Sequence, residues 1–321
     1  MPDRARAASV AAPNSSFSGV QIGIITYSYR SLPGTAEDLL KYITQCGISS
    51  VELMGGPAEQ FARAATGTKG NGQAPMEGFK ALRKMYNDAG VNIHIVKFGN
   101  IGEAGMSDEQ IDYYFRVAKA LGAKGITREI SEPAAKRLGK IADKHEIMIG
   151  FHNHTQVTPT TYDGPILSHG KHLAINLDIG HYVAGTSRSP IPIIEKFKDR
   201  ILSLHLKDRK DNQGPNMPFG QGDTPVKLGP VAASAISEVV PASVGRVILD
   251  HAAARDPAQL RRPAAGRGRS RGFPPVRSDR SAGMHLEVGG KLSQSGRLLG
   301  QQVDRRGALL GNDRGALRGL V

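Results

Sequence analysis

Short apolar runs alternate along the chain with longer stretches in which apolar residues recur every three or four positions. The runs, such as residues 20–27 and 50–54, are rich in β-branched residues and predict strands. The longer stretches, such as residues 76–89, predict amphipathic helices, several of which end at Gly. The alternation has a period of about 30 residues, which predicts βα units with parallel strands.

The pattern yields enough units to distinguish between two α/β architectures. The predicted strands are residues 20–27, 50–54, 91–96, 125–130, 147–151, 173–177 and 201–204, with 245–250 as a candidate eighth. The predicted helices are residues 35–47, 76–89, 107–121, 132–145, 191–199 and 228–240. Seven units before residue 209 favour a (β/α)₈ TIM barrel, complete only if strand eight forms. A doubly wound sheet is the alternative, but residues 27–33 lack the Gly-rich first turn that it would normally carry.

Composition changes this picture mainly at the two ends of the chain. With 39% apolar residues the chain can bury a sizeable core, and Cys46, its one cysteine, excludes an intramolecular disulfide. Residues 251–321 hold 14 basic and 5 acidic side chains, so they carry +9 of the net charge of +13. The remaining +4 does not indicate a nucleic-acid-binding surface on the body.

We therefore divide the chain into a flexible leader (1–19), a TIM-barrel domain (20–250) and an Arg/Gly-rich tail (251–321). For the tail, three interpretations stay open: a disordered basic segment, translation out of frame from a GC-rich gene, and a nucleic-acid-binding tail. The leader lacks the apolar segment of a signal peptide, and no apolar run is long enough for a membrane span. We expect a cytoplasmic protein as written, or an exported one if a longer signal precedes the sequence.

Three predicted strands in the middle of the chain end in residues that commonly bind metals. The first is followed by His152 and His154, the second by Asp178 and the third by His205. In a barrel, the carboxyl ends of parallel strands surround one site. Imidazole and carboxylate together suit Mn²⁺, Co²⁺, Zn²⁺ or Fe²⁺. We predict His152, Asp178 and His205 as metal ligands, because an uncompensated charge or imidazole at such a position would be costly.

Other polar residues at strand ends are candidates with open alternatives. Glu129 could be a metal ligand or a base, and Glu52 could be a polar residue inside the barrel or a substrate contact. His181 could cap a helix or reach the site. Lys207 and Asp208 lead into a charged loop, so the residues beyond them could form a solvated face. The loop 218–225 has two Gly residues, which is a weak indication of phosphate binding.

Four motifs together resemble the xylose-isomerase-like TIM barrels, especially the sugar phosphate isomerase/epimerase family, with inosose dehydratase and the ketose 3-epimerases as relatives. The motifs are Gly-Phe-His-Asn-His at 150–154, Asn-Leu-Asp-Ile-Gly-His at 176–181, Leu-His-Leu-Lys-Asp at 204–208 and Phe-Gly-Gln-Gly-Asp at 219–223. The resemblance covers about residues 20–227, roughly two thirds of the chain. It is fairly specific for the superfamily but does not name a substrate.

The resemblance implies one divalent metal ion held by a Glu/Asp/His/Glu-type set from the later strands. Asp178 and His205 match the members from strands six and seven. Many relatives have Glu on strand five where this chain has His152, so Glu129 is a substitute candidate. Strand eight should bring a second carboxylate, and only Asp250 is available there. If that carboxylate is missing, the resemblance implies a protein without activity.

The predicted function is that of a metal-dependent sugar isomerase or epimerase, an enzyme that abstracts a proton next to a carbonyl through a metal-stabilised enediolate. The cofactor is one divalent ion (Mn, Co, Zn or Mg). The assigned residues are Glu129 and His154 for catalysis, and Glu52, His181, Lys207 and Asp208 for substrate binding. The expected partner is a small sugar or polyol, with no membrane or nucleic acid, and homo-oligomerisation stays open. The alternatives are a catalytically impaired relative that binds carbohydrate or is structural, a dehydratase or lyase, and a DNA-repair nuclease.

Overall fold

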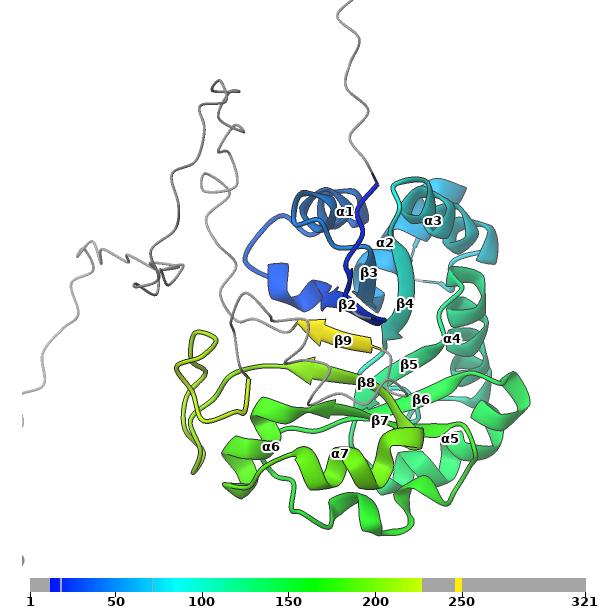
Figure 1. The fold of residues 1–321 in the computed structure, drawn as a ribbon. Helices are drawn as coiled ribbons and strands as arrows, with labels where there is room; N and C mark the ends of the chain where they lie inside the picture. The colour runs from blue at the N-terminus through cyan, green and yellow to red at the C-terminus, as the bar shows by residue number, and fades with distance from the viewer. Residues whose placement is uncertain (1–11, 18, 71, 227–245, 250–321) are drawn as a thin grey trace, which may run out of the picture. The chain divides into compact units, whose positions relative to one another are not determined.

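Eight parallel strands close into a barrel in the computed structural model, which describes residues 12–17, 19–70, 72–226 and 246–249. These residues all fall within Met1–Ala264, the first of two units into which the chain divides. Each strand pairs with its neighbour in sequence, and β9 pairs with both β8 and β2 (Figure 1), which closes the ring. The strands are β2 Val20–Ile25, β3 Ser50–Met54, β4 Asn92–Lys97, β5 Gly125–Glu129, β6 Met148–His152, β7 Leu173–Asp178, β8 Ile201–Leu206 and β9 Arg246–Leu249.

Helices follow most of these strands and cover the outside of the barrel (Figure 1). They are α1 Ala36–Gln45, α2 Gly55–Thr66, α3 Met76–Asp88, α4 Asp108–Leu121, α5 Glu132–His145, α6 Ile179–Thr186 and α7 Ile191–Phe197. Short 3₁₀ segments are η1 Thr26–Tyr29, η2 Thr161–Asp163, η3 Pro165–Leu167 and η4 Lys198–Arg200. None of the helices in the described part of the chain is long and apolar enough to cross a membrane.

The buried apolar residues in the described part of the chain form two clusters. A large cluster of buried apolar residues extends over strands and covering helices alike, and a small one joins Ile95, Ala174 and Leu202. A Cβ atom placed at Gly125 or Gly150 would lie only 2.6 or 3.0 Å from the Leu202 side chain. The absence of side chains at these two Gly residues therefore leaves the room that Leu202 occupies.

The predicted TIM barrel is confirmed, and most of its elements lie where the hydrophobic pattern placed them. A capping box begins the helix α4: Ser107 Oγ accepts from Gln110 N, and the Gln110 side chain accepts from Ser107 N. The candidate eighth strand is β9, which completes the ring. The predicted helix 228–240, Asp250 and the tail 251–321 lie outside the described residues.

Two helices are not predicted by the hydrophobic pattern. Gly55 and Gly56 resemble the end of a strand in sequence, but α2 begins there at once. A Cβ atom at Gly55 would collide with the Phe98 ring. Gly55 therefore permits close packing at the start of a helix and is not a secondary-structure breaker. The helix α6 also begins directly after its strand, with Asp178 as its N-cap.

The leader prediction needs a correction as well, because part of residues 1–19 belongs to the barrel unit. The strand β1, Ser16–Phe17, pairs antiparallel with the start of β2. Ser15 is buried, and its hydroxyl donates to Ile22 O at 2.6 Å. This hydrogen-bonded segment precedes the first barrel strand, whereas residues 1–11 are outside the described range.

Candidate active site

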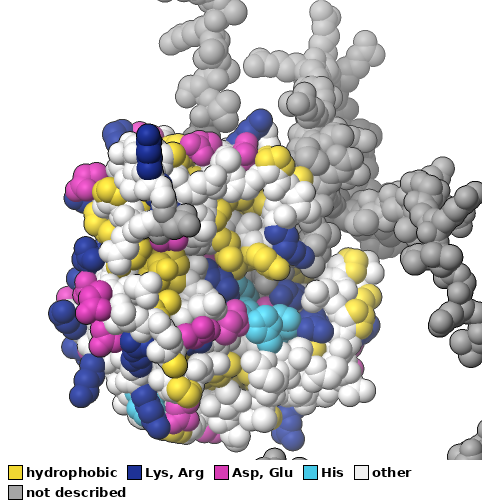
Figure 2. Space-filling view, turned by 180° about the vertical axis from the view of Figure 1, so that it is seen from behind, with side chains coloured by type: hydrophobic (Ala, Val, Ile, Leu, Met, Phe, Trp, Pro, Cys, Tyr) yellow, Lys and Arg dark blue, Asp and Glu magenta, His cyan; other side chains and the backbone are white. Residues whose placement is uncertain are grey.

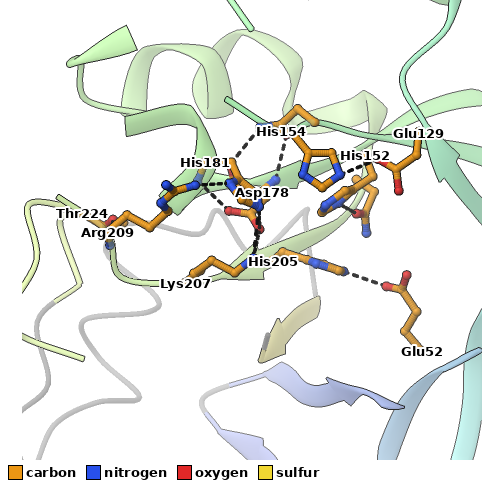
Figure 3. A network of polar contacts seen from close by, with 12 residues as sticks. Glu52, Glu129, His152, His154, Asp178, His181, His205, Lys207, Arg209 and Thr224 are labelled. Carbon is orange, nitrogen blue, oxygen red and sulfur yellow. Dashed lines mark hydrogen bonds and ion pairs between the residues drawn. The ribbon is translucent and has the colours of Figure 1, made fainter. Parts of the chain in front are cut away.

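The three residues predicted as metal ligands come together at the carboxyl ends of neighbouring strands. His152 ends β6, Asp178 ends β7 and His205 lies near the end of β8. All three are buried, and one ligand atom from each lies within 4.8 Å of the others. Figure 3 shows their side chains directed toward a common space.

The imidazole of His152 is oriented by an amide behind it. His152 Nδ1 lies 2.7 Å from Asn176 Oδ1, while Asn176 Nδ2 donates to Ser203 Oγ at 2.6 Å. The amide oxygen can only accept, so Nδ1 carries the hydrogen and Nε2 keeps its lone pair. Burial lowers the pKa of His152 to about 3, helped by the charges of His205 and Lys97, so the ring is neutral at neutral pH. A neutral imidazole is the form that binds a metal.

Glu52 contacts the imidazole of His205 and orients it. The predicted role of Glu52 as a substrate contact is therefore corrected. Its Oε2 lies 2.8 Å from His205 Nε2, and its Oε1 accepts from Thr127 Oγ1 at 2.6 Å. Burial raises the pKa of Glu52, but His205, Lys97 and Thr127 outweigh it and bring the pKa to about 2. The carboxylate is fully buried and ionised, so it holds Nε2–H of His205 and directs Nδ1 to the ligand space. Sequence alone leaves both roles open, because each needs a polar residue on β3.

The two carboxylate oxygens of Asp178 have different roles, one in capping a helix and one in the site. Oδ1 accepts from His181 N at 2.7 Å and so caps α6. Oδ2 is buried, makes no hydrogen bond to the described residues, and lies 3.2 Å from Lys207 Nζ. Burial raises the pKa of Asp178, but Lys207 and three histidines reverse this, and the net pKa is lowered. An ionised oxygen without hydrogen bonds beside two oriented imidazoles fits a divalent cation.

The side chain of Asn153 joins the strand ends that carry His152 and Asp178. Its Nδ2 donates to Asp178 O at 3.0 Å, and its Oδ1 accepts from Asp178 N at 2.9 Å. The buried amide thus fixes one ligand strand against the next.

The two residues predicted as catalytic are in direct contact at the mouth of the site. Glu129 Oε2 lies 2.8 Å from His154 Nε2, and Glu129 Oε1 accepts from Lys97 Nζ at 2.9 Å. Burial raises the pKa of Glu129, but His154 and Lys97 lower it far more, so the carboxylate is ionised. His154 is half-exposed, and a histidine patch is visible near the centre of the face in Figure 2, with acidic and basic side chains beside it. Lys97 also belongs to the site, although no role was predicted for it from sequence. The signal in the sequence that could have identified Lys97 is its position at the end of β4.

His181 reaches the site, where two cations approach its ring. Arg209 Nη1 lies 2.6 Å from Nδ1, and Lys207 Nζ lies 3.1 Å from Nε2. Burial lowers the pKa of His181 to about 4, against the opposing charge of Asp178. A second histidine set with metal-binding spacing joins His181 to His152 and His154. The cations at both ring nitrogens disfavour that set, because a metal ion would have to displace one of them.

Asp208 does not face the site, and its predicted role as a substrate contact is corrected. Its Oδ2 accepts from the backbone N–H groups of Gly220 and Gly222, at 2.8 and 2.9 Å. These are the groups that a phosphate would need in the loop 218–225, and a carboxylate of the chain itself already occupies them. Asp208 therefore anchors this loop and leaves it no phosphate cradle.

We expect Asp208→Ala to release the loop, because two backbone N–H groups lose a charged acceptor, at a cost of about 1–3 kcal/mol. Amide hydrogen exchange should accelerate at Gly220 and Gly222 by about tenfold or more, while the barrel strands keep their protection. Asp211→Ala, which alters an exposed carboxylate of the same segment, is the matched control. Unchanged exchange at both Gly residues would show that Asp208 does not hold the loop.

Comparison with solved structures supports the fold, whereas comparison of sequences finds no match. No protein-family model matches the chain, and no curated protein matches it by sequence. A probable 3-DHS dehydratase of Bacillus anthracis, involved in petrobactin synthesis, superposes with a TM-score of 0.55 at 13% identity, over 73% of this chain and 93% of the other. A xylose isomerase domain protein of Planctomyces limnophilus gives 0.52 at 14% identity, over 74% and 91%. A family 2 AP endonuclease of Brucella melitensis gives 0.50 at 13% identity, over 73% and 93%. The resemblance that the four motifs indicated is thus confirmed for the fold: this chain is folded as a xylose-isomerase-like TIM barrel.

Proposed function

We propose that this chain is a metal-dependent sugar isomerase or epimerase that abstracts a proton next to a carbonyl. The observation that carries the proposal is the buried set of His152, Asp178 and His205, whose ligand atoms lie within 4.8 Å of one another. Hydrogen bonds behind both imidazoles fix their orientation, as is usual for metal-binding histidines. A divalent ion bound there would polarise the carbonyl and an adjacent hydroxyl of a sugar and stabilise the enediolate charge.

The residues around this set supply the rest of the chemistry. Glu129 is ionised between Lys97 and His154, so it can accept a proton from a substrate carbon. His154 contacts Glu129 and is half-exposed, so it can exchange that proton with an oxygen or with solvent. Lys207 and His181 face the site from the side of α6 and β8 and contact substrate oxygens in this proposal. Glu52 and Asp208 act only through His205 and through the loop, respectively.

Solvent-proton exchange tests this function even though the sugar is unidentified. The full-length protein, loaded with Mn²⁺, is incubated with a panel of aldoses, ketoses and their phosphates in D₂O; Mn²⁺ is then removed and the sugars are followed by NMR. We expect deuterium at C3 of a ketose for an epimerase, or at C1 or C2 for an isomerase. Exchange should be lost in Asp178→Asn. It should persist in Asp163→Asn, which alters an ion pair with Lys196 outside the site.

Two results would count against the proposal. A fully metal-loaded protein that exchanges no proton in any sugar of the panel is not an enolising sugar enzyme. Release of water from a substrate without return of an isomer would place the chain among the dehydratases.

A further inference from the structure

The ring of His181 lies between two positively charged donors. Arg209 Nη1 approaches Nδ1 at 2.6 Å and Lys207 Nζ approaches Nε2 at 3.1 Å. A neutral imidazole has one N–H and one lone pair, so it can accept a hydrogen bond at only one of these atoms. A guanidinium and an ammonium are both donors only, and the contact with Arg209 is the shorter of the two. Nδ1 is therefore the acceptor, and Nε2 carries the hydrogen.

Arg209 is itself held in this position by the segment that follows it. Its Nε and Nη2 both donate to Gly214 O, at 3.1 and 2.5 Å. Its backbone N–H donates to Thr224 Oγ1 at 3.1 Å, and its carbonyl accepts from Asp223 N at 2.8 Å. The Nε/Nη2 edge of the planar guanidinium is thus fixed, and the remaining nitrogen, Nη1, is aimed at His181. This is a preorganised contact and not a flexible surface arginine.

With this tautomer, two donors converge on the same space. Nε2–H of His181 and the ammonium of Lys207 cannot bond to each other, but both can donate to one oxygen placed between them. In the described part of the chain, Asp178 Oδ2 lies 3.2 Å from Lys207 Nζ but 3.7 Å from His181 Nε2, which is beyond hydrogen-bond reach of the ring. The space between the two donors thus suits an oxygen that is negatively charged or becomes so during a reaction.

We propose that Arg209 is a positioning residue that locks His181 in the Nε2–H tautomer, so that His181 and Lys207 together form a two-donor site for a substrate oxyanion. The inference rests on the proposed function for the identity of that oxyanion, an enediolate oxygen. Arg209 does not touch the substrate in this arrangement. Without Arg209 the ring can place its hydrogen on Nδ1 and accept from Lys207 at Nε2, which removes both donors from the site at once.

The tautomer can be measured directly by NMR, without turnover. Long-range ¹H–¹⁵N correlation on the full-length ¹⁵N-labelled protein in Mg²⁺ distinguishes a protonated ring nitrogen from one with a lone pair, and His181→Asn assigns the signals. We expect a lone pair on Nδ1 and a hydrogen on Nε2 in the wild type. In Arg209→Met the two should exchange, and Arg209→Lys, which retains a cationic donor, should restore the wild-type pattern at least in part. Arg188→Met, at an exposed arginine after α6, is the matched control and should leave the pattern unchanged.

Kinetics separates positioning from substrate binding once the exchange assay has found a sugar. Arg209→Met should lower kcat by about 10²-fold, as loss of an oxyanion donor does, with KM and metal content nearly unchanged.

Either of two spectra overturns the inference: a wild-type ring with its hydrogen on Nδ1 or on both nitrogens, or an Arg209→Met ring that keeps Nε2–H. If Arg209→Met does not fold, the wild-type and Arg209→Lys spectra still decide. A protein without exchange activity could still show the expected tautomer, so failure of the proposed function and failure of this inference remain distinguishable.

Discussion

Replacement of Asp178 by Asn is expected to abolish metal binding and proton exchange while the fold is kept. The amide oxygen can still cap α6, because it can accept from His181 N as Asp178 Oδ1 does. The negative charge of the second oxygen is lost, and Asn offers a divalent ion a much weaker ligand. Loss of a residue that only supports a ligand typically lowers metal affinity by about 10–100-fold. We expect a loss of more than about 100-fold, measured by isothermal titration with Mn²⁺.

The variant also removes a buried counter-charge, since Asp178 Oδ2 lies 3.2 Å from Lys207 Nζ. Breaking such a pair can cost several kcal/mol, so thermal unfolding must be followed in parallel. Asp163→Asn provides the control, because it makes the same change at the ion pair with Lys196 on the surface. If folded Asp178→Asn binds Mn²⁺ as tightly as the wild type, Asp178 is not a ligand.

The second large effect is expected at Glu52, which lies outside the reacting space. Glu52→Gln keeps the shape of the side chain and can still accept from His205 Nε2–H, but it removes the charge behind the ring. The imidazole then becomes a poorer ligand, and we expect Mn²⁺ affinity to fall by about 10–100-fold. Activity at saturating Mn²⁺ should recover in large part, because Glu52 does not touch the substrate.

Thr127→Val separates this effect from general damage to the core. It removes the hydroxyl that donates to Glu52 Oε1 at 2.6 Å and leaves the contact between Glu52 and His205. Its Mn²⁺ affinity should fall by less than that of Glu52→Gln. An equal loss in both variants would indicate that the buried network supports packing and not the ligand. A rise in KM without loss of metal in Glu52→Gln would instead restore Glu52 to the role of substrate contact.

The barrel could be predicted well from sequence because hydrophobic period and strand position are local properties. Parallel strands buried on both faces, such as β7, give uninterrupted apolar runs, and their ends meet by symmetry at one rim. The choice of His152, Asp178 and His205 followed from that rule and from the cost of an uncompensated charge or imidazole at such a position. The helices α2 and α6 were missed because Gly55 and Gly180 resemble breakers in sequence. In the structure each meets a close neighbour, the Phe98 ring or the backbone of Lys207.

The roles of Glu52 and Asp208 could not be predicted because they depend on residues far away in the chain. Glu52 contacts His205, 153 positions later, and only closure of the barrel brings them together. Asp208 accepts from Gly220 and Gly222, so its carboxylate belongs to the loop although its neighbour Lys207 belongs to the site. The spacing of residues on one strand indicates a face, but not which distant group satisfies each side chain. For the same reason, a solvated face stayed open for the residues from Arg209 onward.

The most direct test of the central claim is the position of the metal ion, given by anomalous scattering from crystals of the full-length protein grown with Mn²⁺. Our account predicts one peak in bonding contact with His152 Nε2, Asp178 Oδ2 and His205 Nδ1. A peak among His152, His154 and His181 instead, or no peak at saturating Mn²⁺, would contradict it.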